Sequence, residues 1–430
     1  MKKVLMITYY WPPAGGPGVQ RVLKFAKYLP QFGWKPIILT VQNGEYPAYD
    51  ESLFDDIPPE CKVYRTPSIE PFAMYKRFTG MKEDEAIPVA ALTEKKIGWK
   101  KKLAHWIRLN LFIPDAKIGW IPFAVKAGKH IIKNEKPDVI FSSSPPPTVH
   151  LIAKSLARWS GIKWIADFRD PWTKIYHYDS LKRFYLSKYF DEKFEAAVLR
   201  KTNITITVSS SIAELLNHKK NCTQSIRIIP NGFDEQEIPE YKQNLSLNKF
   251  TLAYAGKINS QQNPCNLWKI LGELTSEDND FCKNFQILLM GNFDSVILNE
   301  IRNNGIDKKL FLAGYVSHKE TLENLSGSNI LLLLIPNTSR NKGILPGKLF
   351  EYLAIGKFIL GIGPKNGEVA EILNQTNSGK MFEYTDFDNL KSELKLQYKM
   401  WELNETKALH QNIIMKYSRR VQTKNLVTFF

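Results

Sequence analysis

The sequence has only four cysteines in 430 residues, and this scarcity excludes two kinds of architecture. None of the four has a CxxC spacing or a histidine pattern nearby, so neither a zinc site nor a disulfide framework is indicated. Long apolar runs are also missing. The longest aliphatic stretch, residues 330–335, is far shorter than the roughly 20 residues that a helix needs to cross a bilayer. We therefore expect a buried strand there.

Two further signatures are absent near the N-terminus. The first residues combine two lysines with a short apolar run, as a signal peptide does, but the segment 11–13 (Trp-Pro-Pro) interrupts the run and no small-residue cleavage site follows. We expect the first β-strand of a cytoplasmic protein instead. The glycines of residues 15–18 lack the GxGxxG spacing of a dinucleotide-binding turn, so NAD is disfavoured. A flexible turn and a substrate-binding loop both fit this segment.

Acidic residues are the scarcer charged class, with 43 against 59 basic residues, a formal net charge of +16 and a pI near 9.4. An anionic partner is expected. The excess is concentrated in residues 95–108, where Trp99 and Trp106 alternate with cations. This composition suits an anionic membrane surface, but also a solvated helix whose tryptophans face the core. Nucleic acid is not expected, because no recognition motif is present and only this short stretch alternates aromatic and basic residues.

The order of the apolar runs predicts two α/β domains. A strand, a Pro/Gly loop at 12–18, a helix from about Val19 to Phe32 and a second strand form an opening βαβ unit, and a similar series of strands follows a polar linker at 241–249. We predict two Rossmann-like doubly wound domains facing a cleft, at 1–235 and 250–400, and a helical tail at 401–430 that can pack on the first domain. The predicted strands are 4–8, 36–40, 138–141, 163–166, 204–208, 226–230, 252–255, 286–290, 310–313 and 329–335.

Residues 343–362 have the sequence of a loop, a helix and a strand that bind an anion. Pro346 and Gly347 end the loop, and Lys348 opens the helix beside its unpaired N–H groups. Because the helix dipole contributes only about 0.3 to 1 kcal/mol, binding a diphosphate requires these donors and Lys348 together. Glu351 would repel a diphosphate that it faced, so we expect it to bind a vicinal diol such as a ribose. An ordinary buried helix with a Pro-Gly start remains the alternative.

Two polar loops follow consecutive predicted strands of the first domain. Residues 142–147 (Ser-Ser-Ser-Pro-Pro-Pro) form one, and residues 167–172 form the other. In a parallel sheet both loops would lie at the same edge. Asp170 is a candidate for contact with a sugar, while the alternative is that Asp167 and Asp170 cap the turn and pair with Arg169. Among the seven histidines only His150 lies near such a loop, and a core or surface role is preferred for it.

Five segments, taken in this order, carry a family resemblance. They are Met6 to Pro13 with Gly15-Gly16, Asp167 to Trp172, Ile228 to Asp234, Tyr254 to Lys257, and Pro346 to Tyr352. Together they resemble glycosyltransferase family 4, a group of retaining nucleotide-sugar enzymes of bacterial surface polysaccharide synthesis with the GT-B architecture. The resemblance covers nearly the whole chain.

The resemblance implies that the donor nucleotide binds the C-terminal half and that the acceptor enters from the N-terminal half. Lys257 and Lys348 would neutralise the diphosphate, and Glu351 would hold the ribose. The implied donor-binding residues are Gly15, Gly16, Lys257, Tyr315, Val316, Gly347, Lys348, Leu349 and Glu351, and the implied catalytic residues are Asp170, Arg169 and Lys348. The chain departs from the family at Gly343, where many members have a glutamate, and at Lys257 and Gln262, which replace an arginine and a lysine.

We therefore expect transfer of a hexose, with retention of configuration, from a nucleotide diphosphate sugar such as a UDP sugar. The acceptor would be a hydroxyl of a lipid-linked or oligosaccharide molecule in the synthesis of lipopolysaccharide, another surface polysaccharide or a glycolipid. No metal or other cofactor is expected, because lysines and a helix N-terminus would stabilise the departing diphosphate. The basic segment would bind an anionic membrane, at the inner face of the cytoplasmic membrane. The alternatives are a nucleotide-sugar epimerase on the same architecture and a nonenzymatic basic protein that docks on membranes.

Overall fold

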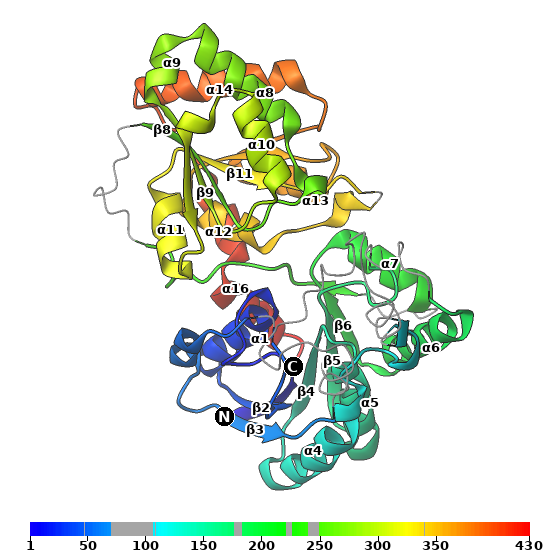
Figure 1. Ribbon diagram of the computed structural model, residues 1–430. Coiled ribbons are helices and arrows are strands. Elements are labelled where there is room, and N and C mark those ends of the chain that lie inside the picture. Colours follow the sequence, from blue (N-terminus) through cyan, green and yellow to red (C-terminus); the bar gives the residue numbers. More distant parts are fainter. Residues whose placement is uncertain are drawn as a thin grey trace. The chain divides into compact units, whose positions relative to one another are not determined.

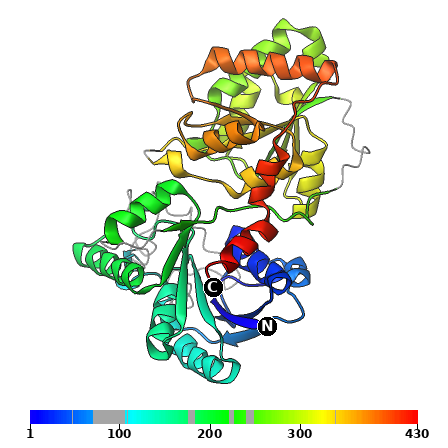
Figure 2. The ribbon, with the colours of Figure 1, turned by 180° about the vertical axis from the view of Figure 1, so that it is seen from behind.

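The computed structural model (Figure 1 and Figure 2) divides into two units. Unit 1 comprises residues 1–230 and 419–430, and unit 2 comprises residues 231–418. The N-terminal segment of unit 1 ends at Pro230, whereas the predicted boundary is residue 235. The C-terminal segment that belongs to unit 1 begins at Arg419, whereas the predicted tail begins at residue 401. Residues 241–248 of the predicted linker and residues 95–105 and 108 of the basic segment lie outside the described residues. The structure describes residues 1–46, 48–69, 106–107, 109–175, 183–220, 226–239, 249–338 and 340–430.

Unit 1 is built on a seven-stranded parallel sheet in the order β3-β2-β1-β4-β5-β6-β7. The order runs outward from β1 in one direction and from β4 in the other, so the connections diverge between these two strands. Ligands of doubly wound sheets bind outside the carboxyl ends of the strands at such a point. The strands are β1 (Lys2–Ile7), β2 (Trp34–Val41), β3 (Lys62–Thr66), β4 (Val139–Ser144), β5 (Lys163–Phe168), β6 (Ile204–Thr207) and β7 (Arg227–Ile228).

Both faces of this sheet are buried, as the alternation of β1 shows. Val4 and Met6 contribute to one core, whereas Leu5 and Ile7 contribute to another on the opposite face. The first core includes residues of α1 and α16, and the second includes residues of α4 and α5. The C-terminal helix therefore belongs to the packing of unit 1. The helices of this unit are α1 (Pro17–Tyr28), α4 (Ile121–Glu135), α5 (Thr148–Ser160), α6 (Tyr185–Lys201), α7 (Ser210–Lys220) and α16 (Arg419–Val427).

Unit 2 repeats the arrangement with six parallel strands in the order β10-β9-β8-β11-β12-β13. Its connections diverge between β8 and β11. The strands are β8 (Phe250–Ala255), β9 (Phe285–Met290), β10 (Leu310–Gly314), β11 (Ile330–Leu334), β12 (Phe358–Ile362) and β13 (Gly379–Phe382). The helices are α8 (Cys265–Glu277), α9 (Asn279–Asn284), α10 (Ser295–Asn303), α11 (His318–Ser326), α12 (Gly347–Ile355), α13 (Glu368–Thr376), α14 (Phe387–Glu402) and α15 (Gln411–Ile414).

Helices cover both faces of the second sheet as well (Figure 1). The core that contains Leu252 and Tyr254 includes residues of α8, α10 and α14, and the core that contains Ala253 includes residues of α12 and α13. The predicted α/β architecture of two doubly wound domains is confirmed. None of the helices in the described part of the chain has the length and apolarity to span a bilayer.

Candidate anion site of unit 2 and polar cluster of unit 1

Lys348 lies at the divergence point of the unit 2 sheet. It is on the first turn of α12, which follows β11, and its Nζ donates to the carbonyl of Ala255, the last residue of β8, at 2.8 Å. A second hydrogen bond of 2.9 Å goes to the hydroxyl of Tyr254, and the ammonium lies 4.0 Å from the centroid of the same ring. The side chain thus links the start of α12 to the end of β8, one of the two strands between which ligands of this fold class bind.

The ammonium of Lys348 is only partly exposed and contacts neutral oxygens. Burial lowers its pKa to about 8, against the opposing effect of the Glu351 carboxylate three residues further along α12. The group remains protonated at neutral pH. A phenol hydroxyl and a peptide carbonyl orient the cation without neutralising it, so its charge can still attract an anion.

Two glycines allow the backbone to approach this lysine. Gly256 has φ +125°, and a Cβ built on it would lie 2.9 Å from the Nζ of Lys348. Gly291 has φ +121°, and its Cβ would lie 2.3 Å from the carbonyl oxygen of Gly256. Since both the dihedral angles and the space disfavour a side chain, the turns after β8 and β9 require glycine here. The sequence motif singled out neither Gly291 nor Tyr254 as a site residue.

Helix α12 begins with its N-terminus uncapped by a side chain. Pro346 is its N-cap in an extended conformation, no acidic residue lies in its first turn, and Gly347 is exposed. Leu349 differs from its neighbours, because its side chain is buried in the core and its N–H donates to the carbonyl of Pro346 at 3.1 Å. At this end of the helix, the residues left to contact a nucleotide-sugar donor are therefore Gly347 and Lys348.

The other predicted donor residues of unit 2 lie at the same edge of the sheet. Lys257 follows β8 with an exposed side chain, and its carbonyl accepts a hydrogen bond of 2.9 Å from Tyr254. Tyr315 and Val316 follow β10; Tyr315 is 88% exposed, whereas Val316 packs against the α12 core. Glu351 is half-buried on α12. The strand ends thus gather cations, one carboxylate and an exposed aromatic ring.

Unit 1 uses its charged residues differently. Arg21 on α1 is buried and binds Asp167 at the end of β5 through two hydrogen bonds of 2.9 Å, and Ser143 donates to the same carboxylate at 2.7 Å. The remaining guanidinium donors reach the carbonyls of Ile229 and Pro230, each at 2.8 Å. Burial alone would raise the pKa of Asp167, but Arg21 and Ser143 outweigh it and hold the pKa below its usual range.

Arg169 also bonds to protein groups rather than facing an open site. It is 8% exposed, and its guanidinium donates to the carbonyls of Ser144 at 2.8 Å, Gly18 at 2.6 Å and Pro145 at 3.2 Å. The side chain therefore connects the loop after β4 to the start of α1. Asp170, the next residue, is exposed at the end of β5. In the alternative, Asp167 and Asp170 both pair with Arg169. The hydrogen bonds of Asp167 go to Arg21 instead, while burial lowers the pKa of Arg169 against the opposing charges of Asp167 and Asp170.

The two glycines before α1 have different surroundings. Gly15 donates its N–H to the carbonyl of Ala48 at 2.8 Å, and an added Cβ would lie 3.2 Å from Asp50, so its small size serves packing. Gly16 is the exposed N-cap of α1 with φ +80°, and no atom would lie within 4 Å of an added Cβ. Of the two glycines, only Gly16 has a backbone that is exposed to solvent.

His150 is a core residue. It is fully buried, it stacks on Phe168 with ring centroids 4.4 Å apart, and its Nδ1 shares a hydrogen bond of 2.8 Å with Ser142. Trp164 donates to the same hydroxyl at 2.8 Å. Burial lowers the pKa of His150 to about 3, so the ring is neutral at ordinary pH. The preference for a core role is supported by this geometry.

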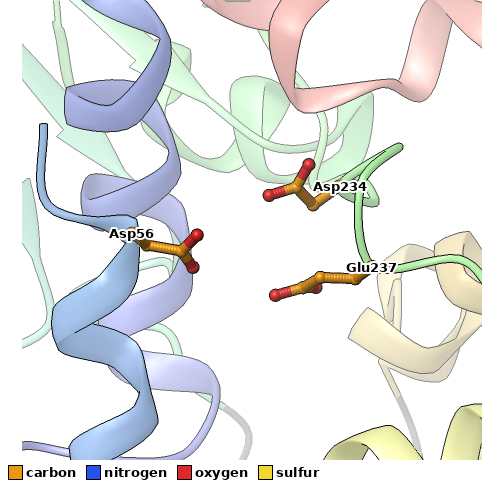
Figure 3. Close-up of side chains that lie close together, drawn as sticks. All are labelled: Asp56, Asp234 and Glu237. Carbon is orange, nitrogen blue, oxygen red and sulfur yellow. The ribbon is translucent and has the colours of Figure 1, made fainter.

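Figure 3 shows the carboxylates of Asp56, Asp234 and Glu237. Each of them has a partner within its own unit. In unit 1, Asp56 pairs with Lys24 at 2.5 Å and with Lys27 at 2.6 Å. In unit 2, Asp234 accepts from the N–H of Gln236 at 3.1 Å, and Glu237 lies 3.6 Å from His318. These contacts explain the three carboxylates as partners of protein groups within each unit.

Two Asp-x-Asp triplets, a spacing that can bind a divalent cation, also occur in unit 2. Asp278 caps α9, because its Oδ1 accepts from the N–H groups of Asp280 at 2.9 Å and Phe281 at 3.0 Å. Asp386 pairs with Lys365 and accepts from Asn389 at 2.6 Å. The first aspartate of one triplet thus caps a helix, and the first aspartate of the other forms a surface ion pair.

The fold and these motifs agree with comparisons to known proteins. The sequence profile described as Glycosyltransferase Family 4 matches residues 18–237. A search of curated proteins finds no match.

Several solved structures share the fold across the whole chain at low sequence identity. Sucrose-phosphate synthase from Thermosynechococcus elongatus has a TM-score of 0.65 at 12% identity, covering 100% of this chain and 98% of that one. HepE from Anabaena, solved with UDP and glucose, has a TM-score of 0.60 at 10% identity, with coverage of 100% and 99%. The lipopolysaccharide outer core galactosyltransferase WaaB has a TM-score of 0.56 at 13% identity, with coverage of 100% and 98%.

Proposed function

Because the chain belongs to glycosyltransferase family 4 and is a glycosyltransferase with the GT-B fold, we propose that it transfers a hexose from a nucleotide diphosphate sugar. The acceptor is a hydroxyl of a lipid-linked or oligosaccharide molecule, and the anomeric configuration is retained. Membership in an enzyme family makes the alternative of a nonenzymatic docking protein wrong. The proposed donor is a UDP sugar, a choice supported by HepE, which was solved with UDP and glucose.

The observation that carries this proposal is the position of Lys348. Its ammonium lies at the divergence point of the unit 2 sheet, beside an α-helix N-terminus without a side-chain cap and against two neutral oxygens. A diphosphate brings the negative charge that this arrangement lacks. As the bond between sugar and phosphate breaks, negative charge grows on the leaving diphosphate, and a cation already in place stabilises that charge without rearrangement.

The neighbouring residues receive roles that their chemistry supports. Glu351, on the same helix, binds the ribose hydroxyls, because its carboxylate accepts hydrogen bonds and is repelled by phosphate. Exposed Lys257 is the second cation for the diphosphate, and the backbone at Tyr315 and Val316 binds the base. We propose that these groups act without a metal, since lysines can supply the positive charge that a divalent cation supplies elsewhere.

Unit 1 is proposed to bind the acceptor. Asp170 is exposed just after β5 and contacts the acceptor or the transferred sugar. Arg169 acts as a positioning residue, because its guanidinium is engaged by three carbonyls of the surrounding loops. WaaB, a lipopolysaccharide outer core galactosyltransferase, supports an acceptor of surface polysaccharide or glycolipid synthesis. Such an acceptor favours a protein attached peripherally to the inner face of the cytoplasmic membrane.

The test is a thermal-shift screen of nucleotide sugars, followed by turnover with the donor that binds. A donor at about 100 times its dissociation constant adds about 2.7 kcal/mol of stability. Glu351→Ala should lose most of this shift while it remains folded, whereas Glu371→Ala, an exposed acid on α13, should keep it. Turnover in EDTA should equal turnover with added magnesium. If none of the nucleotide sugars raises the melting temperature of the wild type, the proposal is contradicted.

The epimerase alternative makes a different product. An epimerase would convert the donor sugar without releasing free nucleotide in the presence of an acceptor, whereas the transferase releases one nucleotide diphosphate for each sugar transferred. Free nucleotide measured alongside the sugar product therefore separates the two activities.

A further inference from the structure

Near its N-terminus, helix α6 exposes large apolar side chains, whereas further along it buries Val198 and Leu199 in the core of unit 1. Tyr185 is 79% exposed and Leu186 is 65% exposed, and Tyr189 and Phe190 are about half exposed. The buried polar residues of the helix are Ser187, Asp191 and Glu195. An amphipathic surface helix normally has the opposite arrangement. Figure 1 shows α6 on the periphery of unit 1, where it packs against α5 and α7.

Specific contacts fix this orientation of the helix. Ser187 donates to the carbonyl of Asn110 at 2.9 Å, and Asp191 accepts from the indole of Trp172 at 2.6 Å and pairs with Arg183 at 2.8 Å. Glu195 accepts from the hydroxyl of Thr173 at 2.6 Å. Rotating α6 to bury its aromatic residues would break all of these bonds, and the three polar side chains would lose these partners. The apolar face is therefore directed outward by the fold itself.

The surface continues onto residues 106–107 and 109–111. Asn110 is buried, and it accepts from the N–H of Phe184 at 2.7 Å and donates to the carbonyl of Trp106 at 2.9 Å. These bonds place Trp106 beside Phe184, with ring centroids 5.2 Å apart, and Leu111 is also exposed. We name this surface the aromatic face; it comprises Trp106, Leu111, Phe184, Tyr185, Leu186, Tyr189 and Phe190.

Cations accompany the aromatic face. Helical spacing puts Lys193 on the same side as Tyr185 and Tyr189, and its Nζ lies 5.2 Å from the centroid of the Tyr189 ring. Lys188 is exposed on the same half of α6, where Glu192 is the exposed acid. Trp106 and Ile107 are the described residues of the basic segment at 95–108. Tyrosine, tryptophan and lysine together are the residues that favour the boundary between lipid headgroups and acyl chains.

We propose that the aromatic face docks unit 1 on the surface of an anionic lipid bilayer, with Leu186 and the rings entering the headgroup layer and Lys188 and Lys193 contacting lipid phosphates. This proposal rests on the lipid-linked acceptor of the proposed function, because such an acceptor is presented at a bilayer surface. An anionic bilayer matches both properties of the face, since apolar insertion and cationic attraction act together there. Another protein surface would match the exposed rings but would leave the positive charge without a specific partner.

The experiment is flotation of the full chain with vesicles of equal parts phosphatidylcholine and phosphatidylglycerol, and with vesicles of phosphatidylcholine alone. The protein should float with the anionic vesicles. The triple variant Tyr185→Ser/Leu186→Ser/Phe190→Ser should lower the bound fraction at limiting lipid by about ten-fold or more. The variant Lys188→Glu/Lys193→Glu should lower it by several-fold, and salt should weaken the binding of the wild type.

A matched control removes exposed apolar residues elsewhere in the chain. Val296→Ser/Leu396→Ser/Leu403→Ser changes three exposed side chains of unit 2 and should float as the wild type does. A wild type that does not float, or a Tyr185→Ser/Leu186→Ser/Phe190→Ser variant that floats fully, overturns the proposal. So does light scattering that shows a dimer lost in this variant, because the face would then bind a second copy.

These outcomes are separate from those of the proposed function. The serine triple variant should keep the thermal shift with donor, because its substitutions are on α6 of unit 1, whereas Lys257, Lys348 and Glu351 belong to unit 2. If the wild type floats but binds no nucleotide sugar, the proposed function fails and the docking surface stands. If the donor binds and the wild type does not float, the reverse holds.

Discussion

The two units share one fold but use the charged residues at the ends of their strands in opposite ways. In unit 1, Arg21 and Asp167 are both buried and form a two-bond ion pair. In unit 2, the ammonium of Lys348 contacts the hydroxyl and ring of Tyr254 and the carbonyl of Ala255, so its charge is oriented but not neutralised. The difference teaches that a charge at the carboxyl edge of such a sheet can stabilise loops or can await a ligand, according to its partner.

The partner also decides the direction of each pKa shift. Asp167 is held below its usual pKa by Arg21 despite burial, because the paired charge favours ionisation. Lys348 has its pKa lowered to about 8 by burial, because no paired charge in direct contact compensates the lost hydration. A group that pays this penalty in the free protein is stabilised when an anion arrives, which is the behaviour of a binding residue.

The largest expected effect on stability comes from breaking the ion pair of unit 1. Arg21→Met should lower the free energy of unfolding by about 3 to 5 kcal/mol, because it leaves the Asp167 carboxylate buried without its cation. Denaturant unfolding followed by tryptophan fluorescence measures the change. Arg21→Met/Asp167→Leu should recover a large part of it. A single variant as stable as the wild type would show that the pair does not hold unit 1 together.

Lys348→Met should have the opposite pattern, with a large effect on activity and little on stability. We expect kcat/KM for the donor to fall by about 100- to 1,000-fold, because one charged donor to the leaving group is lost. The free energy of unfolding should remain within about 1 kcal/mol of the wild type, since the buried ammonium is itself penalised. Lys357→Met, a partly buried lysine at the other end of α12, is the control for activity. Equal activity in both variants would refute the role of Lys348.

The smallest predicted effect concerns pH and the hydroxyl of Tyr254. Because the folded pKa of Lys348 lies below its unfolded value, the free protein loses this ammonium as pH rises through about 8. Consequently, kcat/KM for the donor should fall above that pH, while kcat at saturating donor persists to higher pH, since a bound diphosphate raises the pKa. Tyr254→Phe removes an acceptor from the ammonium and should move this alkaline limb of kcat/KM to lower pH. A pH profile that is identical in Tyr254→Phe would contradict the assignment.

The strands of both sheets could be predicted closely where they are apolar and buried on both faces. Residues 330–335 were expected as a buried strand, and β11 covers Ile330–Leu334. The strand β3 was not expected, because it lies at the edge of its sheet and its residues are only partly buried, so no apolar run marks it. The same reasoning explains why β13, another edge strand that begins with glycine and lysine, was not predicted.

The candidate site could be predicted in part. Lys348, Glu351 and Gly256 belong to short motifs that can be recognised in the sequence alone. Tyr254 and Gly291 could not be found in this way, because each acts through a contact with a distant segment, at the Nζ of Lys348 and at the carbonyl of Gly256. The exposed aromatic residues of α6 could not be predicted either, since the sequence of this helix has little amphipathic periodicity to show which side faces the core.

The sequence by itself determined the alternation of strands and helices, the two-unit organisation and the positive charge, because these follow from local patterns and composition. Only the tertiary structure decided which charges are neutralised. Whether Asp167 meets Arg21, and whether Lys348 meets a carboxylate or a carbonyl, depends on how segments far apart in the chain are brought together. The energy of an ionised group depends on those neighbours and on its burial, and neither is encoded in the residue's own identity.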